Sequence, residues 1–324
     1  MSLSYKLMIL LFIYILYIDN FSKNNIIKYK YNSNPIVLDN SENHLQGYHP
    51  KVISFSKSFN GYKYWMAYTP YPKAKATKEN PCIIASNDLI HWITPQGLIN
   101  PLDVPLISNH HSYNSDTHLL FNEDTQNLEI FWRYVNLYQN KAIIYFKKSQ
   151  NGIIWSEKKI FLITKNRKKH DYLSPVIIYE KGIYKIWYIS HKKIYYMEKR
   201  DKEFTLAKIL EVNYKGNYHS WHLDLIYNKQ KKLYELITCA YIKKRKVMPL
   251  FYSSSKDNIS WSKFILILSP AIGTSKFDSQ GLYRSSLLFL KGTYYLFYSA
   301  HDKNYNVGIG IMFGRSINHL KPYI

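Results

Sequence analysis

The chain has 324 residues, of which 46% are hydrophobic and 17% aromatic, enough to bury a core, so the composition excludes wholesale disorder. It carries 44 Lys and Arg against 22 Asp and Glu, a net charge of +22, which is compatible with an anionic partner or simply with a solvated basic surface. Because no zinc-finger spacing, RNP sequence or basic helix accompanies the charge, a nucleic-acid partner is not expected.

Residues 1–24 differ from the rest of the chain. An unbroken apolar run from Leu7 to Ile18 follows Lys6, which is typical of a secretory signal peptide and short for a membrane span. No small-residue cleavage site follows, so a signal peptide, a signal anchor and an N-terminal element of the fold all stay open. We expect residues 25–34 to form a linker. We expect the protein to be secreted or anchored at the cell surface, with this segment as its only membrane contact.

From Pro35 onward, short runs rich in β-branched and aromatic residues alternate with turn residues, a pattern typical of strands. No amphipathic helix is expected among them. Hairpin turns are expected at Asn60-Gly61, Lys181-Gly182 and Lys291-Gly292. The runs fall into five sets of three, at 52–55, 64–68 and 82–86; 117–121, 128–134 and 142–146; 176–179, 184–189 and 193–196; 223–227, 233–238 and 250–253; and 286–290, 294–299 and 307–313.

A short phrase, Ser-x-Asp/Asn-x-x-x-Trp, follows three of the sets, at 86–92, 149–155 and 255–261, and weaker copies at 198–204 and 316–322 keep the spacing. A repeat of this length indicates a repeat architecture. Each phrase precedes another extended run, so the sequence predicts an all-β fold, a five-bladed β-propeller of four-stranded antiparallel blades around a central channel, over residues 35–324. The phrase itself is expected to be structural, with its Ser and Asp or Asn bonding turn amides and its Trp packing between blades.

In a propeller the first strand of each blade lines the channel, so the starts of the five first strands converge. Counting back from each phrase places polar and aromatic residues at these starts, and the ends of neighbouring strands add others. Such convergent groups predict a pocket, although they could instead cap strands or fill the channel with hydrated polar groups. The binding candidates are His49, His118, Arg133, Ser174, His219, His222, Tyr283 and Arg284, and the acidic candidates are Glu79, Asp116 and Asp224.

The repeat and the polar strand starts resemble the five-bladed propeller glycosidases, namely glycoside hydrolase family 43 and the invertase/levansucrase group, over residues 35–324. These enzymes usually carry Asp before Pro in blade one, Asp in blade two and Glu in blade three. Asp116, in Ser115-Asp116-Thr117-His118, matches the blade-two residue. His49-Pro50 and Ser174-Pro175 stand where the other two are expected. The resemblance therefore implies a glycoside hydrolase-like protein with a divergent catalytic set.

Glycoside hydrolysis usually needs two carboxyl groups that flank the scissile bond. The catalytic candidates are Asp116, Asp224 and Glu79, and a histidine could replace a carboxyl group in proton transfer. Arg133 and Arg284 would bind hydroxyls or a sugar carboxylate through their planar guanidinium groups. Two other functions stay open: a glycan-binding propeller without catalysis, and a propeller scaffold for protein partners.

No cofactor is expected from the sequence. Cys82 and Cys239 lie in apolar runs typical of buried thiols, and neither C-x-x-C nor H-E-x-x-H occurs, so no dedicated metal site is predicted. A structural cation in the channel, for example at His222, stays open. The expected partner is a carbohydrate, neutral or acidic, and the expected oligomeric state is a monomer.

Overall fold

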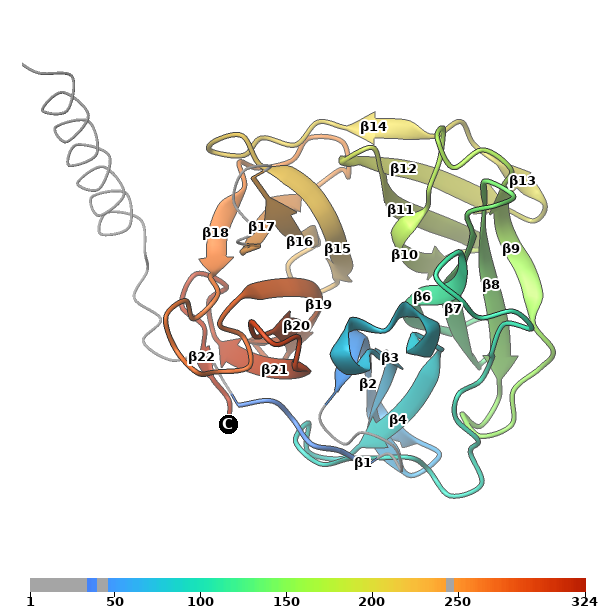
Figure 1. Cartoon of the computed structure of the whole chain (residues 1–324), viewed down its shortest axis with the longest axis horizontal. Coiled ribbons are helices and arrows are strands. Elements are labelled where there is room, and N and C mark those ends of the chain that lie inside the picture. The colour runs from blue at the N-terminus through green and yellow to red at the C-terminus, as the bar shows by residue number, and fades with distance from the viewer. Residues whose placement is uncertain (1–33, 40–45, 243–247) are drawn as a thin grey trace, which may run out of the picture. The chain divides into compact units, whose positions relative to one another are not determined.

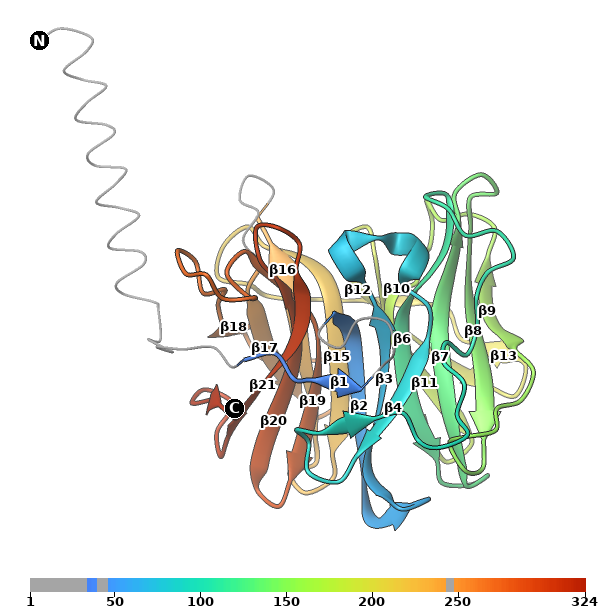
Figure 2. The ribbon, with the colours of Figure 1, turned by 60° about the horizontal axis from the view of Figure 1, so that its bottom comes forward.

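The computed structural model describes residues 34–39, 46–242 and 248–324, so the predicted signal segment and nearly all of the predicted linker lie outside the described residues. Five antiparallel sheets are arranged in a ring around a central axis, as Figure 1 shows face-on and Figure 2 shows tilted. The predicted five-bladed β-propeller is thereby confirmed. Within the described ranges, no helix is long and apolar enough to cross a membrane.

The blades follow one another along the chain, and each runs from an inner to an outer strand. Blade 1 holds β2 (Gly47–Phe59), β3 (Tyr62–Pro70), β4 (Cys82–Ser86) and β5 (Trp92–Ile93), and blade 2 holds β6 (Ser112–Asn122), β7 (Asn127–Asn136), β8 (Lys141–Ser149) and β9 (Lys159–Thr164). Blade 3 holds β10 (Leu173–Glu180), β11 (Ile183–Ser190) and β12 (Lys193–Arg200), and its outer position is shared by β13 (Glu203–Phe204) and β14 (Lys208–Leu210). Blade 4 holds β15 (His219–Asn228), β16 (Leu233–Tyr241), β17 (Leu250–Ser255) and β18 (Ile265–Leu268), and blade 5 holds β19 (Gly281–Leu290), β20 (Thr293–His301), β21 (Val307–Gly314) and β22 (Lys321–Pro322).

The three predicted hairpin turns are confirmed by their backbone conformation. Both residues of Asn60-Gly61 have positive φ, 45° and 84°, and Lys181-Gly182 and Lys291-Gly292 repeat this pattern. Positive φ at both central residues is the signature of the two-residue turn whose twist matches a β-hairpin, and glycine adopts it without steric cost. These turns fix the register of the inner two strands in blades 1, 3 and 5.

All five inner strands are interrupted near their starts by a β-bulge or register shift. The shifts fall between Tyr48 and Lys51, Ser115 and His118, Leu173 and Val176, Ser220 and His222, and Leu282 and Ser285. In blades 1 to 3 the shifted stretch contains a non-glycine residue with positive φ, namely His49 (51°), Asp116 (51°) and Ser174 (53°). A bulge bends its strand and re-aims a side chain, so the fold turns these strand starts toward the channel at equivalent positions.

The repeated phrase has the structural role predicted for it. In blade 1 the Ser86 hydroxyl accepts the Leu89 amide at 3.0 Å, and Asp88 Oδ1 accepts the amides of Ile90 and His91 at 2.9 and 2.8 Å. The copies at 149–155 and 255–261 repeat these bonds. The phrase therefore closes the turn between the third and fourth strands of its blade.

The fourth residue of the phrase packs each turn against the preceding blade. Leu89, Gly152 and Asn258 occupy this position with φ of 72°, 75° and 61°. A Cβ on Gly152 would lie 2.3 Å from the Trp65 ring of blade 1, and Asn258 accepts a hydrogen bond from the Trp187 indole of blade 3 at 2.9 Å. The spacing of the phrase is thus set by contact between blades as well as by the turn.

The first described residues close the ring. The Ile36 amide donates to the Ile309 carbonyl of blade 5 at 2.8 Å, whereas β1 (Leu38–Asp39) pairs in parallel with β5 of blade 1. Ile36 and Leu38 are each 1% exposed in a hydrophobic cluster shared by blades 1 and 5. A Cβ on Gly47 would come within 2.4 Å of Leu38 Cδ1, so a larger residue at this position would displace the Leu38 side chain. One short segment thereby joins the first blade to the last.

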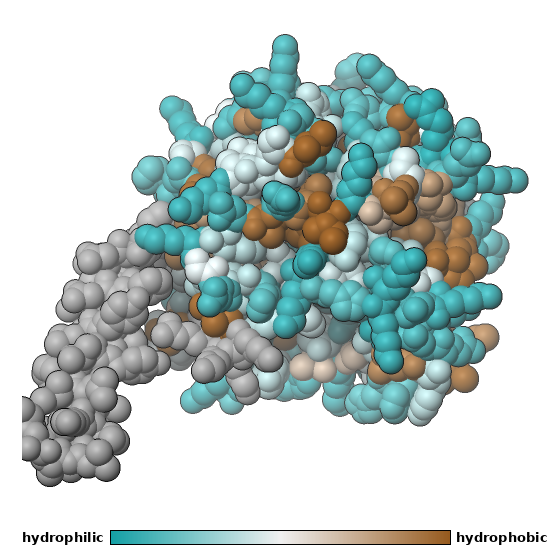
Figure 3. All heavy atoms as spheres, turned by 90° about the horizontal axis from the view of Figure 1, so that it is seen from above, coloured by the Kyte–Doolittle hydropathy of each residue, from teal (hydrophilic) through white to brown (hydrophobic). Residues whose placement is uncertain are grey.

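On the face shown in Figure 3, hydrophilic residues predominate and hydrophobic ones form separate patches. The 3₁₀ turns η1 (Pro72–Ala74) and η2 (Ala76–Lys78), cyan in Figure 2, stand beyond the end of β3, at the same end of the ring as the bulged strand starts. This end of the ring carries the candidate site.

Candidate functional site

Three buried side chains from three different blades meet at the bulged strand starts. His49 of β2, Asp116 of β6 and His222 of β15 each offer one potential ligand atom, and these atoms lie within 4.8 Å of one another. Asp116 Oδ1 is 3.2 Å from His222 Nδ1 and 3.8 Å from His49 Nε2. We call His49, Asp116 and His222 the triad. Residues separated by up to 173 positions in the sequence thus converge on one carboxylate.

The triad holds polar atoms that lack a hydrogen-bond partner among the described residues. These are His49 Nε2, Asp116 Oδ1 and both ring nitrogens of His222. The other nitrogen of His49, Nδ1, is 3.0 Å from the Thr69 hydroxyl, which fixes the ring. Buried polar groups without partners are costly, so a cluster of them facing one point indicates a site for a ligand.

Two arginines surround the same carboxylate. Arg284 NH1 is 3.7 Å from Asp116 Oδ1, and Arg133 NH1 is 4.0 Å from Asp116 Oδ2. Arg133 is held in turn by Asp171, whose Oδ1 accepts from NH2 at 2.7 Å. Arg284 NH2 donates to the Pro175 carbonyl at 2.6 Å. Both guanidinium groups are therefore positioned by their own partners, and they add positive charge beside the triad.

These contacts set the protonation states in the triad. Burial alone would raise the pKa of Asp116, but His222, His49 and Arg284 together hold it well below its usual range. Burial lowers the pKa of His49 to about 3, against the opposing effect of Asp116, and burial also lowers the pKa of His222. Near neutral pH the triad is thus one carboxylate and two neutral imidazoles, the forms that bind metal ions.

Glu79 lies at the edge of the triad, directly after η2. Its Oε2 is 3.6 Å from His49 Nδ1, and the residue is 6% exposed. Burial, and then the charge of Asp116, raise the pKa of Glu79 well above its usual range. Glu79 and Asp116 are thus two neighbouring carboxyl groups with opposite pKa shifts, which is typical of acid–base pairs at functional sites.

Aromatic rings line the blade-4 and blade-5 side of the triad. The Tyr283 ring lies 4.0 Å from the His222 ring and is stacked on Tyr48 at 4.7 Å. The Trp221 indole donates to the Tyr283 hydroxyl at 3.0 Å, which fixes both side chains. Tyr283, predicted from sequence, is therefore beside the triad. Tyr48 and Tyr71, whose rings are 5.1 Å apart, extend this wall and were not among the named binding candidates.

Three other predicted residues, His118, Ser174 and Asp224, use their side chains in hydrogen bonds to other strands of the protein. The His118 Nε2 atom contacts the Ile177 backbone, and the Ser174 hydroxyl bonds the Leu223 backbone, so each ties two inner strands together. The Asp224 carboxylate accepts from the Lys51 ammonium at 2.6 Å and from the Leu287 amide at 2.9 Å. Their functional roles stay predictions, whereas the contacts themselves link inner strands of different blades.

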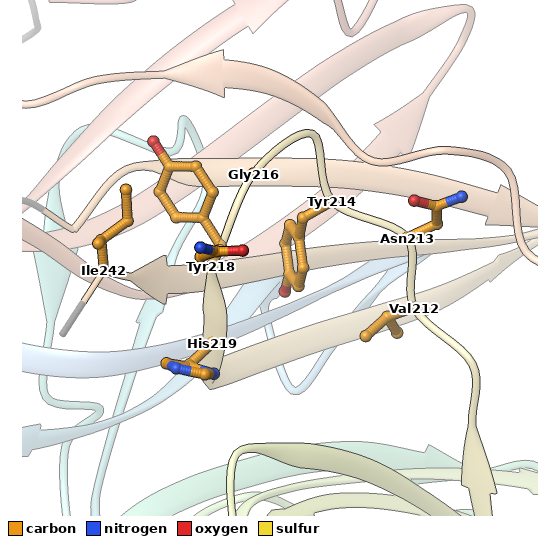
Figure 4. Close-up of a pocket in the computed structure, with 8 residues that line it drawn as sticks. Val212, Asn213, Tyr214, Gly216, Tyr218, His219 and Ile242 are labelled. Carbon is orange, nitrogen blue, oxygen red and sulfur yellow. The ribbon is translucent and has the colours of Figure 1, made fainter.

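His219, the remaining predicted residue, lies at the start of β15 and lines a pocket of about 590 Å³. Figure 4 shows this pocket, with Tyr218 seen between Ile242 and Tyr214, near the loop at Gly216.

Register counting from the repeated phrase placed His49, Asp116, His222 and Arg284 at equivalent strand starts. It did not predict that two imidazoles and a carboxylate would form a metal-type cluster, because that depends on bulge geometry.

No family model matches the chain. A stretch of 88 residues, 27% of the chain, is 34% identical to an A type blood N-acetyl-α-D-galactosamine deacetylase from Flavonifractor plautii. This match spans only 11% of that relative's length. The sequence similarity is therefore confined to a part of each protein.

Solved structures resemble the chain over most of its length. A crystal structure of an N-acetylgalactosamine deacetylase from F. plautii, in complex with blood group B trisaccharide, has a TM-score of 0.76 and 20% identity and covers 87% of this chain and 95% of its own. An exo-1,5-α-L-arabinanase from a bovine ruminal metagenomic library has a TM-score of 0.59 and 12% identity, covering 83% and 93%. A thermostable family-43 glycoside hydrolase has a TM-score of 0.56 and 12% identity, covering 91% and 96%. The chain is thus a five-bladed β-propeller with the fold of the family-43 glycoside hydrolases, as the resemblance in its sequence predicted.

Proposed function

We propose that the protein is a metal-dependent deacetylase that removes an N-acetyl group from a sugar. The observation that carries this proposal is the buried triad of His49, Asp116 and His222, whose unpartnered nitrogen and oxygen atoms face one another within 4.8 Å. The local 34% identity to an N-acetylgalactosamine deacetylase and the resemblance of the folds support it. The neighbouring propellers act on or bind carbohydrates, which supports a carbohydrate substrate more broadly.

The triad fits a divalent metal ion by its chemistry. Two neutral imidazoles and one carboxylate are a common donor set for Zn²⁺, Fe²⁺ and related ions, and three protein ligands leave positions open for water and substrate. A metal held there would supply Lewis-acid polarisation of a carbonyl group and a water molecule with a lowered pKa. Thr69, at 3.0 Å from His49 Nδ1, orients the ring so that Nε2 faces the cluster.

The residues around the triad have three further roles: stabilising the Asp116 charge, transferring protons and excluding water. Arg284 and Arg133 keep Asp116 ionised, so that it acts as a ligand rather than as a base. Glu79 is placed to move protons. Burial and the charge of Asp116 raise its pKa, and the charge of a divalent ion held by the triad would favour its ionised form, which could then accept a proton from the attacking water. The protonated Glu79 then donates to the amide nitrogen as the C–N bond breaks, leaving acetate and a free amine. The aromatic wall of Tyr48, Tyr71 and Tyr283 limits the access of bulk water.

Glycoside hydrolysis is the second candidate, because Glu79 and Asp116 have opposite pKa shifts. In that reaction Glu79 would be the general acid and Asp116 the base or nucleophile. The two arginines beside Asp116 weaken it in either role, since each stabilises the carboxylate and lowers its basicity. The deacetylase proposal uses Asp116 as a ligand and so agrees with this environment.

The test measures two products from the same samples. The purified protein is stripped with a chelator, supplied with Zn²⁺, Mn²⁺, Co²⁺ or Ca²⁺, and incubated with N-acetylgalactosamine glycosides and other N-acetylated sugars. We expect acetate release that needs a divalent ion and no new reducing ends. His49→Ala and His222→Ala should abolish both metal binding and acetate release, whereas His110→Ala, an exposed histidine, should leave both unchanged.

Each result separates the two candidates. New reducing ends without acetate would favour glycoside hydrolysis. Acetate release that withstands the chelator and both histidine substitutions would refute a role for the triad as a metal site.

A further inference from the structure

A row of aromatic rings leads away from the triad along blade 4. The His222 ring is 5.7 Å from that of Trp221, Trp221 is 5.8 Å from Tyr241, and Tyr241 is 5.8 Å from His219. Whereas His222 is buried, Trp221, Tyr241 and His219 are each partly exposed. His219 and Tyr241 are paired directly across β15 and β16, so the row follows the edge of the blade rather than its core.

The row ends at the pocket of about 590 Å³ that His219 lines. The other lining residues come mostly from the loop before β15, which includes Asn213, Asn217 and Tyr218 (Figure 4). Tyr218 packs edge-on against Phe251 at 4.7 Å, which anchors the loop on blade 4. The loop turns at Gly216, where φ is 109°, a conformation that favours glycine. The loop that forms most of the pocket is therefore anchored on the blade.

The described part of the pocket lining is aromatic and amide-rich. Among the described residues that line it, none is Lys, Arg, Asp or Glu. Tyr, Trp and His rings offer an apolar face to the C–H groups of a sugar, and the amides of Asn213 and Asn217 can bond hydroxyls. A neutral glycan, which presents C–H faces and hydroxyl groups, matches the chemistry of the described lining.

We propose that the aromatic row and the pocket form an extended subsite for a neutral oligosaccharide. The sugar to be modified lies at the triad, and the following sugar units run over Trp221 and Tyr241 to His219 and Tyr218. This assignment of the two ends rests on the function proposed above. The substrate is accordingly a glycan of at least two or three units rather than a free monosaccharide.

The test is a binding measurement that does not depend on turnover. Isothermal titration compares a neutral trisaccharide that ends in N-acetylgalactosamine with the methyl glycoside of N-acetylgalactosamine. For the wild type we expect the trisaccharide to bind about tenfold more tightly, because its additional sugar units stack on the aromatic row. In Tyr241→Ala and in His219→Ala the ratio of the two Kd values should fall toward one.

The control is Tyr138→Ala, an exposed tyrosine of blade 2 that is stacked on His111, and it should keep the wild-type ratio. Thermal unfolding checks that each variant is folded, and His219→Ala removes the smaller of the two side chains. An unchanged ratio in both folded subsite variants, or equal wild-type affinity for the two ligands, would overturn the subsite. Tighter binding of a sialylated analogue would overturn its neutral character. Acetate release, measured separately, reports on the proposed reaction alone.

Discussion

At the scale of single residues, the candidate site depends on unusual backbone conformations. His49 and Asp116 both have a φ of 51°, which non-glycine residues seldom adopt and which costs on the order of 1–3 kcal/mol each. Ser174 shares the conformation in blade 3 but bonds the Leu223 backbone instead of joining the triad. The fold therefore offers equivalent bulged positions, and side-chain chemistry decides which of them becomes part of the site.

Glu79→Gln tests the proton-transfer role at this scale. The amide keeps the size of the side chain but cannot accept a proton from water, so acetate release should fall by roughly 10² to 10⁴-fold. Metal binding, measured by titration, should stay close to wild type, because Glu79 contacts His49 at Nδ1, at 3.6 Å, whereas Nε2 is the ring nitrogen that faces the cluster. Glu157→Gln, on the exposed surface, is the matched control. Normal acetate release by Glu79→Gln would exclude Glu79 as the proton carrier.

At the scale of elements, the side chains of the repeated phrase stabilise the turn between the third and fourth strands, and this stabilisation can be measured. Asp88→Ala removes the acceptor of two turn amides and of the Ser86 hydroxyl, and by analogy with helix caps we expect a loss of about 1 kcal/mol in the free energy of unfolding. Urea denaturation measures this loss, with Glu157→Ala as the control.

The effect of Asp88→Ala should depend on pH. Hydrogen bonds from His91, Ile90 and Ser86 lower the pKa of Asp88, although burial alone would raise it. A carboxyl group with a lowered pKa in the folded state stabilises the fold above its unfolded pKa, near 4, and loses this contribution as the pH falls below it. The difference between wild type and variant should therefore shrink as the pH is lowered from 6 toward 2. A difference that grew on acidification would contradict the assigned bonds.

At the scale of the whole molecule, ring closure rests on a few residues before blade 1. Leu38 is 1% exposed between the first and last blades, whereas its neighbour Val37 is 58% exposed. Leu38→Ala leaves a cavity in this seam, so the free energy of unfolding should fall by about 2–4 kcal/mol. Val37→Ala, at the exposed neighbouring position, should be nearly neutral. Equal effects of the two substitutions in urea denaturation would show that the segment does not seal the ring.

Much of the fold followed from local patterns in the sequence. Short β-branched and aromatic runs predicted the strands, and Asn-Gly and Lys-Gly predicted turns that the backbone angles confirm. The repeated phrase predicted five blades and their register, since its side chains bond neighbouring amides and its spacing is fixed by the blade. That register also placed His49, Asp116, His222 and Arg284 at equivalent strand starts around one channel.

The site itself was decided only by the tertiary structure. The sequence predicted no dedicated metal site, because His49, Asp116 and His222 come from three blades and no local spacing relates them. Their meeting within 4.8 Å depends on where each inner strand bulges, and a bulge is a compromise between strand pairing and contacts with the neighbouring blade. The engagement of Asp224 by Lys51 has the same origin, 173 residues apart. Local propensities thus determined the blades of this protein, whereas the chemistry at their centre arises from contacts that exist only once the ring is closed.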